Sequence, residues 1–227
     1  MTKNCVHFNH MVMNNDNLEK LRGIYFNDET LGADNLPADP IELFNQWLAE
    51  AVSTDMLEPN GFVLSTVSNG RPRSRVVLLK GVDEEKFVFY TNYHSAKGRE
   101  IEHGQFVAMN FWWTALGRQV RIEGVIEKVE EHVSDAYFHK RPRGSQLGAI
   151  ASPQSQIVSS RKELEELFNK TSQTFESIEI IPRPKHWGGY AIKPDYMEFW
   201  QGRANRLHDR VSYQLVDEGW KTSRLAP

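Results

Sequence analysis

The sequence predicts a β-rich α+β fold, in which a barrel or closed sheet carries helices packed on its outside. Three observations support this class. Strand-like segments dominate the middle and the end of the chain, the helical segments among them are short and scattered, and the links between strands resemble hairpins. The regular alternation of strand and helix that marks a doubly wound sheet is not seen in the sequence.

Chain length and composition fit one large domain. The chain has 227 residues, of which 40% are hydrophobic and 11% aromatic, enough for a sizeable core. Residues 1–36 are polar and irregular, so we expect a partly flexible N-terminal segment there. Residues 37–227 are expected to form a single domain.

The first regular element is predicted to be an amphipathic helix in "ADPIELFNQWLAEAV". Asp39 is a favourable N-cap residue, and Pro40 stands at the first helical position, where its missing N–H costs nothing. Ile41, Phe44 and Leu48 recur at the spacing of one helix face.

Strand signals follow this helix. "GFVLSTVS" and "RSRVVLLK" flank Asn69-Gly70, the strongest short signal for a hairpin. Further strands are predicted in "KFVFYTN", "QFVAMNFWW", "RQVRIEGVIEKV", "PRPKHWGGYAIKP", "YMEFWQG", "HDRVSYQLV" and "WKTSRLAP". Short helices are predicted at 95–103, 130–140 and 159–175, with a polar loop after 140.

Charge and cysteine content restrict the possible partners. The formal net charge is −3, which argues against bulk binding to nucleic acid. The one cysteine, Cys5, allows no internal disulfide and is typical of a reducing compartment. No segment approaches the ~20 apolar residues of a membrane span, and the first 30 residues hold no apolar run of signal-peptide length. We therefore expect no membrane association and a cytoplasmic location.

Common catalytic motifs are missing from the sequence. It contains no G-x-G-x-x-G after a strand, no P-loop, no H-E-x-x-H, no paired C-x-x-C and no G-x-S-x-G. A metal site is therefore not expected. If the protein is an enzyme, a bound organic cofactor is expected to carry the chemistry.

Four clusters of basic and polar residues are the candidate binding elements. In "RSRVVLLK" an apolar strand is bracketed by Arg75 and Lys80, which suits an anionic or ring-shaped ligand lying along the strand. In "YTNYHSAK" the side chains of Thr91, Ser95 and Lys97 could cradle a phosphate at a helix start. Snorkelling lysines or an ordinary capped loop would give the same patterns.

The third cluster spans residues 136–156. Tyr137 and Arg141 are four residues apart and would share a helix face. A loop rich in donors is expected to follow, with Arg143, Ser145, Gln154 and Ser155. A solvated helix end would also be rich in cations.

The fourth cluster is "RLHDR" with Trp200 a few residues earlier. If the chain is extended here, Arg206, His208 and Arg210 point to one face of a strand, and Asp209 points away toward a neighbouring cation. An aromatic ring beside guanidinium and imidazole groups suits a planar, anionic ligand, although such residues on a surface strand are often merely solvated. Together the four clusters indicate a ligand set with more than one anionic group.

These segments, in this order, resemble the pyridoxamine 5'-phosphate oxidase family. The resemblance is carried by "RVVLLK", "FYTN", "RQVRIEG", "YFHKRPRGSQLGA", Gln154-Ser155, "WGGY", "EFWQG" and "RLHDR", and it runs from about residue 36 to the terminal "RLAP". It implies an FMN-binding split β-barrel with flanking helices, acting as a homodimer with two FMN sites at the subunit interface.

The resemblance also implies roles for individual residues. The expected FMN contacts are Arg75, Val76, Val77, Leu78, Leu79, Lys80, Tyr90, Thr91, Lys97, Gln119, Gln154, Ser155, Trp200 and Arg210. The expected substrate contacts are Lys80, Tyr137, Arg141, Ser145, Arg206, Leu207 and His208, together with Arg22 and Tyr25 of an N-terminal segment. Arg206 and His208 are the expected catalytic pair, which holds the substrate ring against the flavin. Ala96-Lys97 stands where the family usually has two adjacent basic residues.

The implied reaction is oxidation of pyridoxamine 5'-phosphate or pyridoxine 5'-phosphate at C4', with O2 as the final acceptor. Its products are pyridoxal 5'-phosphate, hydrogen peroxide and, from the amine, ammonia. Two alternatives stay open on the sequence alone, since fold does not determine function. One is a non-catalytic protein that binds flavin, haem or pyridoxal phosphate, and the other is a flavin reductase on the same barrel.

Overall fold

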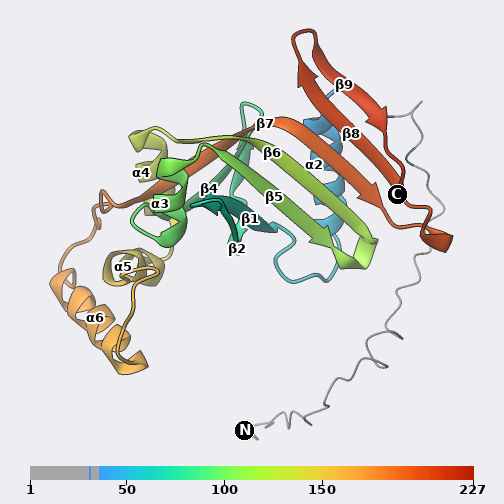
Figure 1. Cartoon of the computed structure of the whole chain (residues 1–227). Coiled ribbons are helices and arrows are strands. Elements are labelled where there is room, and N and C mark those ends of the chain that lie inside the picture. Colours follow the sequence, from blue (N-terminus) through green and yellow to red (C-terminus); the bar gives the residue numbers. More distant parts are fainter. Residues whose placement is uncertain (1–30, 32–35) are drawn as a thin grey trace, which may run out of the picture.

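A computed structural model describes residues 31 and 36–227, and the described residues form one sheet of nine strands (Figure 1). The strand order is β2-β1-β5-β6-β7-β4-β3, with β8 paired to β7 and β9 paired to β8. Helices α3 to α6 gather around one end of the sheet, and α2 packs nearer the other end. The predicted β-rich α+β class is confirmed. The expected contacts Arg22 and Tyr25 lie outside the described residues.

The first helix, α2 (Pro40–Val52), forms as its sequence predicts. The Asp39 carboxylate accepts a hydrogen bond from the Ile41 amide at 2.9 Å, which satisfies one of the unpaired N–H groups of the first turn. Its apolar stripe is inserted into the core. The Phe44 ring lies 4.9 Å from Phe87 and 5.1 Å from Phe111, both in edge-on contacts.

The hairpin of β1 (Gly61–Ser68) and β2 (Arg71–Leu78) is also determined locally. Asn69 and Gly70 have φ values of 52° and 73°, the left-handed conformation that a two-residue hairpin turn requires. Only residues that tolerate positive φ can make this turn without strain.

The chain closes the barrel by passing directly from one end of the strand order to the other. β2 is followed by β3 (Gly81–Asp83), which pairs with β4 (Lys86–Asn92) rather than with β1. Between these strands the Lys80 amide donates to the Val88 carbonyl of β4 at 2.8 Å. β2 and β3 are the first and last strands of the hydrogen-bonded order, so the link between them closes the sheet into a barrel.

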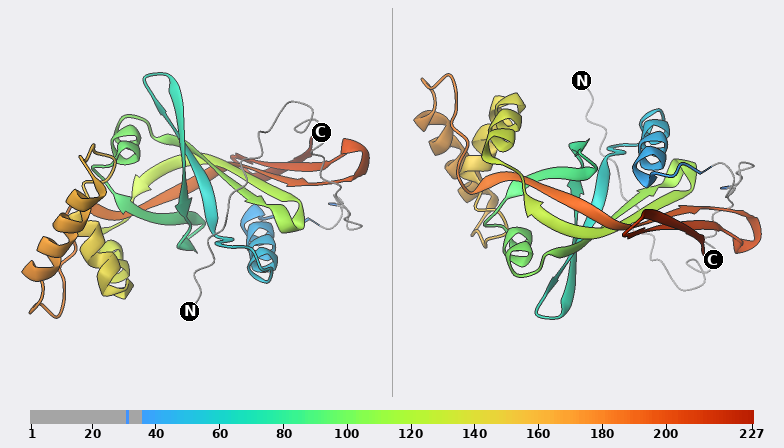
Figure 2. Two further views of the ribbon diagram at one scale, coloured as in Figure 1. Left: turned by 90° about the horizontal axis from the view of Figure 1, so that it is seen from below. Right: turned by 90° about the horizontal axis from the view of Figure 1, so that it is seen from above.

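The remaining strands are β5 (Phe106–Trp113), β6 (Arg118–Lys128), β7 (Trp187–Gln201), β8 (Asp209–Val216) and β9 (Gly219–Arg224). The sequence predicted two strands where β7 is one strand of 15 residues. One edge of β7 pairs with β6. The other edge pairs first with β4 and then, from Tyr196 onward, with β8. The sheet therefore divides along β7, and the β8–β9 hairpin extends away from the barrel (Figure 2).

The division point carries a bulge whose packing requires glycine. Glu123 pairs with Tyr196 and Gly124 pairs with Pro194, so the register skips Asp195 on β7. A Cβ atom at Gly124 would lie 2.1 Å from the Lys193 carbonyl oxygen. The two backbones approach each other more closely here than any side chain permits.

The helices at the other end are α3 (Ala96–His103), α4 (Glu131–Lys140), α5 (Arg143–Ala151) and α6 (Arg161–Thr174). The sequence predicted α3, α4 and α6. The prediction of a loop after residue 140 is wrong, because α5 occupies most of that stretch. Its sequence "RGSQLGAIA" has weak helix propensity, and tertiary packing stabilises it. Leu147 is buried beside Phe138, Ile181 and Trp187 in a second, smaller core.

None of the helices within residues 36–227 is long and apolar enough to cross a membrane.

Replacing Gly124 by alanine should destabilise the fold by more than about 2 kcal/mol, because backbone must move to admit the new methyl group. Gly148→Ala is the matched control. It lies inside α5 with nothing within 4 Å of the added Cβ, so it should gain roughly 0.5–1 kcal/mol from helix propensity. Urea unfolding of both variants measures the difference. Equal effects would contradict the close packing at the bulge.

Candidate active site

A cleft of about 540 Å³ lies between the end of β2, β4, the start of β7 and the helices α4 and α5. It brings together eleven of the residues expected from the sequence, from four separate stretches of the chain. These are Val76, Val77, Leu78, Lys80, Tyr90, Thr91, Lys97, Tyr137, Arg141, Ser145 and Gln154.

The cleft is strongly cationic. Its lining includes Lys80, Lys97, Lys140 and Arg141, and no carboxylate occurs among the described residues that line it. Cations gathered without counter-charges repel one another and lose hydration, so this arrangement favours binding of an anion.

Lys97 is the most buried of these cations, with 8% of its surface exposed. Its Nζ atom donates to the Thr91 hydroxyl at 3.2 Å and to the Gln154 side-chain oxygen at 3.4 Å. Burial lowers the pKa of Lys97, and the nearby Arg75 cation lowers it further, while Glu100 opposes this shift. Glu100 is itself paired with Arg75 at 2.5 Å. An anion bound beside Lys97 would supply the negative charge that its surroundings lack.

The opposite wall of the cleft is aromatic and carries Arg141. The guanidinium lies 4.5 Å above the Trp187 ring, and the rings of Tyr90 and Tyr137 stack at 3.8 Å. Within the described part of the chain, the Nη1 atom of Arg141 is buried and has no hydrogen-bond partner. A buried donor of this kind costs free energy unless a ligand oxygen meets it.

The hydroxyls of the wall remain donors. Burial raises the pKa of Tyr90 and of Tyr137, so both phenols stay protonated near neutral pH. Ser145 adds a further hydroxyl from the first turn of α5, where its amide bonds to the Pro142 carbonyl. The cleft thus offers cations, hydroxyls and flat rings to the same ligand.

A second group of expected residues lies at the far end of the sheet, and we call it the end cluster: Gln119, Trp200, Arg206, His208 and Arg210. Gln119, Trp200 and Arg210 are direct neighbours across β6, β7 and β8. The Trp200 ring lies 4.5 Å from the His208 ring and 5.8 Å from Trp112.

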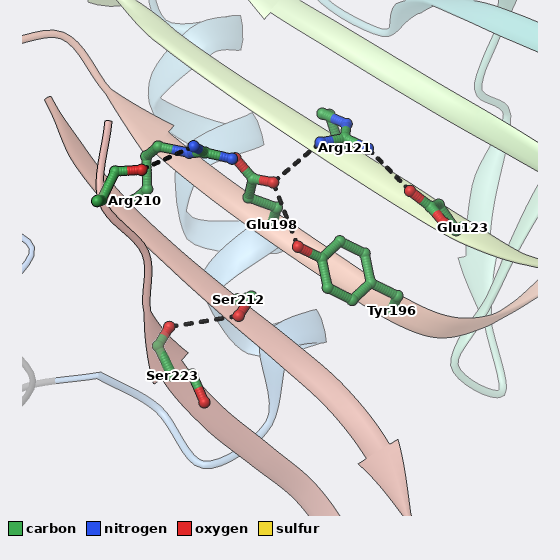
Figure 3. A network of polar contacts seen from close by, with 8 residues as sticks. Arg121, Glu123, Tyr196, Glu198, Arg210, Ser212 and Ser223 are labelled. Carbon is green, nitrogen blue, oxygen red and sulfur yellow. Dashed lines mark hydrogen bonds and ion pairs between the residues drawn. The ribbon is translucent and has the colours of Figure 1, made fainter.

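Arg210 is held by a buried acid. Glu198, 3% exposed, accepts from Arg210 Nε at 2.8 Å, from Arg121 Nη1 at 3.0 Å and from the Tyr196 hydroxyl at 3.2 Å (Figure 3). Three strands contribute to this network, and the carboxylate fixes the two guanidinium groups on one face of the sheet.

The expectation that Arg206, His208 and Arg210 share a strand face is wrong. The chain forms a 3-10 turn at Ala204–Arg206, and β8 begins only at Asp209. Asn205 and Arg206 have φ values of 57° and 60°, so the chain is not extended there and the alternation of faces fails. The expected partner for Asp209 is confirmed, since it accepts from Arg203 and Arg224, each at 2.8 Å.

The cleft and the end cluster are far apart in one chain. Trp187 in the cleft and Trp200 in the end cluster are thirteen residues apart along β7, roughly 40 Å for an extended strand. Of the other expected residues, Arg75 lies beside Lys97 and Leu79 points into the core. Ser155 is exposed and has a φ of 69°.

Sequence reasoning missed Lys140, Trp187 and Glu198 as site residues. Lys140 and Trp187 stand within "YFHKRPRG" and "WGGY", and Glu198 within "EFWQG", so each signal was present. Lys140 and Trp187 enter the cleft, and Glu198 comes to lie beside the end cluster, only once α4 and β7 are packed against their neighbours.

The divided sheet is that of the split-barrel class of proteins. A solved structure from Nostoc punctiforme, a pyridoxamine 5'-phosphate oxidase-related, FMN-binding protein, superposes with a TM-score of 0.65 at 17% identity, over 82% of this chain and 96% of that one. This likeness shows the fold. PhzG from Burkholderia lata superposes with a TM-score of 0.81 at 31% identity, over 88% of this chain and 98% of that one.

The chain belongs to the pyridoxamine 5'-phosphate oxidase family. Residues 48–175 match the family described as pyridoxamine 5'-phosphate oxidase, and residues 187–227 match the pyridoxine 5'-phosphate oxidase C-terminal dimerisation region. The pyridoxine/pyridoxamine 5'-phosphate oxidase of Azotobacter vinelandii is 55% identical over 195 residues, covering 84% of this chain and 90% of that protein. The Synechocystis protein of the same name is 52% identical over 189 residues, 83% of this chain and 88% of that protein. The resemblance inferred from the sequence is confirmed.

Glu198→Gln should lower the free energy of unfolding by about 3 kcal/mol, because it leaves two partly buried guanidinium groups without their shared carboxylate. Glu127→Gln removes a surface pair with Lys86, in which the Glu127 side chain is 57% exposed, and should cost less than about 1 kcal/mol. Equal losses in urea unfolding would show that the buried network has no special role.

Lys97→Met should cost the free protein no stability while weakening the binding of inorganic phosphate roughly ten-fold or more. The folded state lowers the pKa of Lys97 below its ordinary value of 10.5. Between these two pKa values the unfolded chain therefore binds more protons than the folded protein. The stability of the wild type relative to the variant should therefore increase with pH in that window. Thermal unfolding with and without phosphate measures both effects, with Lys170→Met on exposed α6 as control. Unchanged phosphate stabilisation in Lys97→Met would remove Lys97 from the anion site.

Proposed function

We propose that the protein is an FMN-dependent oxidase that converts pyridoxamine 5'-phosphate and pyridoxine 5'-phosphate to pyridoxal 5'-phosphate. O2 is the electron acceptor and hydrogen peroxide a product, and the amine substrate also releases ammonia. The observation that carries the proposal is the cleft with four cations, no described carboxylate and an unpaired Arg141 donor. The names of the related proteins support the choice of substrates.

FMN fits the residues present. Lys97 with Thr91 and Gln154 offers a buried cation and polar groups for its phosphate, and the strand from Arg75 to Lys80 offers backbone groups for its ring. Tyr90 in the cleft and Ser155, which follows Gln154 in the chain, would complete the set. From the end cluster, Gln119, Trp200 and Arg210 would meet the ring. When bound, FMN accepts two electrons from substrate and passes them to O2.

The substrate phosphate fits the other cations of the same cleft. Lys80, Tyr137, Arg141 and Ser145 present two positive charges and two hydroxyls, and the unpaired Nη1 atom of Arg141 gives one defined position for a phosphate oxygen. Arg206, Leu207 and His208 would hold the substrate ring from the turn before β8.

A homodimer would bring these two groups together. Each chain holds the cleft at one end of the sheet and the end cluster at the other, so we propose that each site joins the cleft of one protomer to the end cluster of its partner. The match of residues 187–227 to a dimerisation region supports this arrangement. An exposed apolar surface on β5 and β6 is suited to a partner. It consists of Phe106 (73% exposed) and Trp112 (44%) on one face of β5, and of Val125 (37%), which pairs with Phe106.

The role of the protein in the reaction is positioning and electrostatics. Cations and hydroxyls of the cleft fix both phosphates, which orients C4' without a covalent bond to the protein. Arg206 would set the tilt of the substrate ring, and the stacked aromatic wall excludes water from its neighbourhood. With a single cysteine in the chain, a reducing compartment fits, and the proposal includes a cytoplasmic location.

The test is anaerobic reduction. The protein is saturated with FMN, oxygen is removed and pyridoxine 5'-phosphate is added while flavin absorbance is followed. Bleaching that reverses in air with release of peroxide is expected. A flavin that stays oxidised with both substrates would favour a binding protein, and bleaching only with a nicotinamide donor would favour a reductase.

Arg206→Ala should lower kcat/KM by roughly a hundred-fold while FMN content changes little, since the residue addresses substrate rather than cofactor. Arg206→Lys should recover only part of the loss, because lysine lacks the planar fork of donors. Steady-state kinetics and flavin content of the purified variants measure this. Parallel loss of activity and FMN would contradict the assigned role.

A further inference from the structure

The turn before β8 determines which nitrogen of His208 carries its proton. The backbone amide of Arg203 donates a hydrogen bond to His208 Nδ1 at 3.0 Å. A backbone amide can only donate, so Nδ1 must present a lone pair. In a neutral imidazole the single proton then lies on Nε2.

The amide is held firmly in this position. The Arg203 side chain pairs with Asp209 at 2.8 Å, and both side chains are only 15% exposed. Asp209 is paired in addition with Arg224 of β9 at 2.8 Å. Arg203 therefore closes the turn twice, through its side chain to Asp209 and through its amide to the neighbouring His208. The Trp200 ring, 4.5 Å away, packs against the imidazole.

We propose that the protein holds His208 as the neutral tautomer with its proton on Nε2, so that His208 gives the substrate a hydrogen-bond donor and does not act as a base. This inference rests on the proposed function for its substrate, but the tautomer follows from the turn alone. A protonated ring would have to surrender the bond from Arg203, because both nitrogens would then be donors.

The electrostatic surroundings favour the neutral ring. Burial lowers the pKa of His208, and the Arg206 cation in the same turn lowers it further. The other charged groups of the turn, Arg203 and Asp209, neutralise each other in their ion pair.

The assignment has a consequence for the proton balance of the reaction. Oxidation of the alcohol at C4' would remove a hydride from carbon, which bound FMN would accept, and a proton from the hydroxyl group. His208 cannot take that proton, because Nε2 already carries one and Nδ1 is occupied by the Arg203 amide. The proton therefore leaves to a group other than His208, and His208 serves by donating to an oxygen of the substrate.

The tautomer is tested by nitrogen NMR on the FMN-saturated protein with 15N-labelled histidine rings. His208 is assigned by the signals lost in His208→Gln. Its Nδ1 should resonate as an unprotonated nitrogen and Nε2 as a protonated one at neutral pH. His103 is an internal reference for the opposite tautomer, because its Nδ1 lies 2.7 Å from the Arg99 carbonyl oxygen and must donate there. A protonated Nδ1 on His208 would overturn the inference.

Kinetics of His208→Gln give an independent test. The glutamine amide can donate from a position near that of Nε2 but cannot act as a base. Loss of kcat/KM should stay within about ten-fold, the value of a hydrogen bond. A loss of roughly a hundred- to ten-thousand-fold, typical of a missing general base, would overturn the inference. If the wild-type protein turns over neither pyridoxamine 5'-phosphate nor pyridoxine 5'-phosphate, the proposed function is wrong. The NMR result then decides the tautomer of His208 by itself.

Discussion

The structure depends on strand β7, because one edge of this strand pairs with two different strands in turn. Its first half pairs with β4 inside the barrel, and its second half pairs with β8 outside it. The bulge opposite Gly124 falls between these two halves, and only glycine allows the β6 and β7 backbones to approach so closely there. As a result Trp187 reaches the cleft and Trp200 reaches the end cluster, from opposite ends of the same strand.

The two ends differ in how their charges are balanced. Beside the end cluster, Arg121 and its member Arg210 share the buried carboxylate of Glu198, so these two charges are already partnered in the free chain. In the cleft, Lys97 is buried without an ion pair among the described residues, and Arg141 keeps an unpaired donor. The Glu198 network therefore supports the fold, whereas the cleft keeps cations and a donor that an anionic ligand could meet.

Local sequence signals predicted the local structure well. Asp39 and Pro40 marked the start of α2, and Asn69-Gly70 marked the hairpin, because each acts on its own backbone. Two elements that depend on distant contacts were mispredicted: α5 is stabilised by burial of Leu147, and β7 is continuous because β6 pairs along most of it. The turn before β8 was also missed, because it is closed by side-chain and amide bonds of Arg203 rather than by a turn sequence signal. The residue types of the site were recognisable by resemblance. Their separation into two groups was not, since it follows from the division of the sheet.

The central claim is that each site is shared between two chains, and mixed dimers test it most directly. Arg141→Ala disables the cleft and Arg206→Ala disables the end cluster, so each variant alone should be nearly inactive. In a mixed dimer, one site would contain both changes and the other neither. Random mixing should therefore restore about a quarter of the wild-type activity, because half of the dimers carry one intact site of two. Activity no greater than the average of the two separate variants, in samples shown to contain mixed dimers, would contradict the shared site.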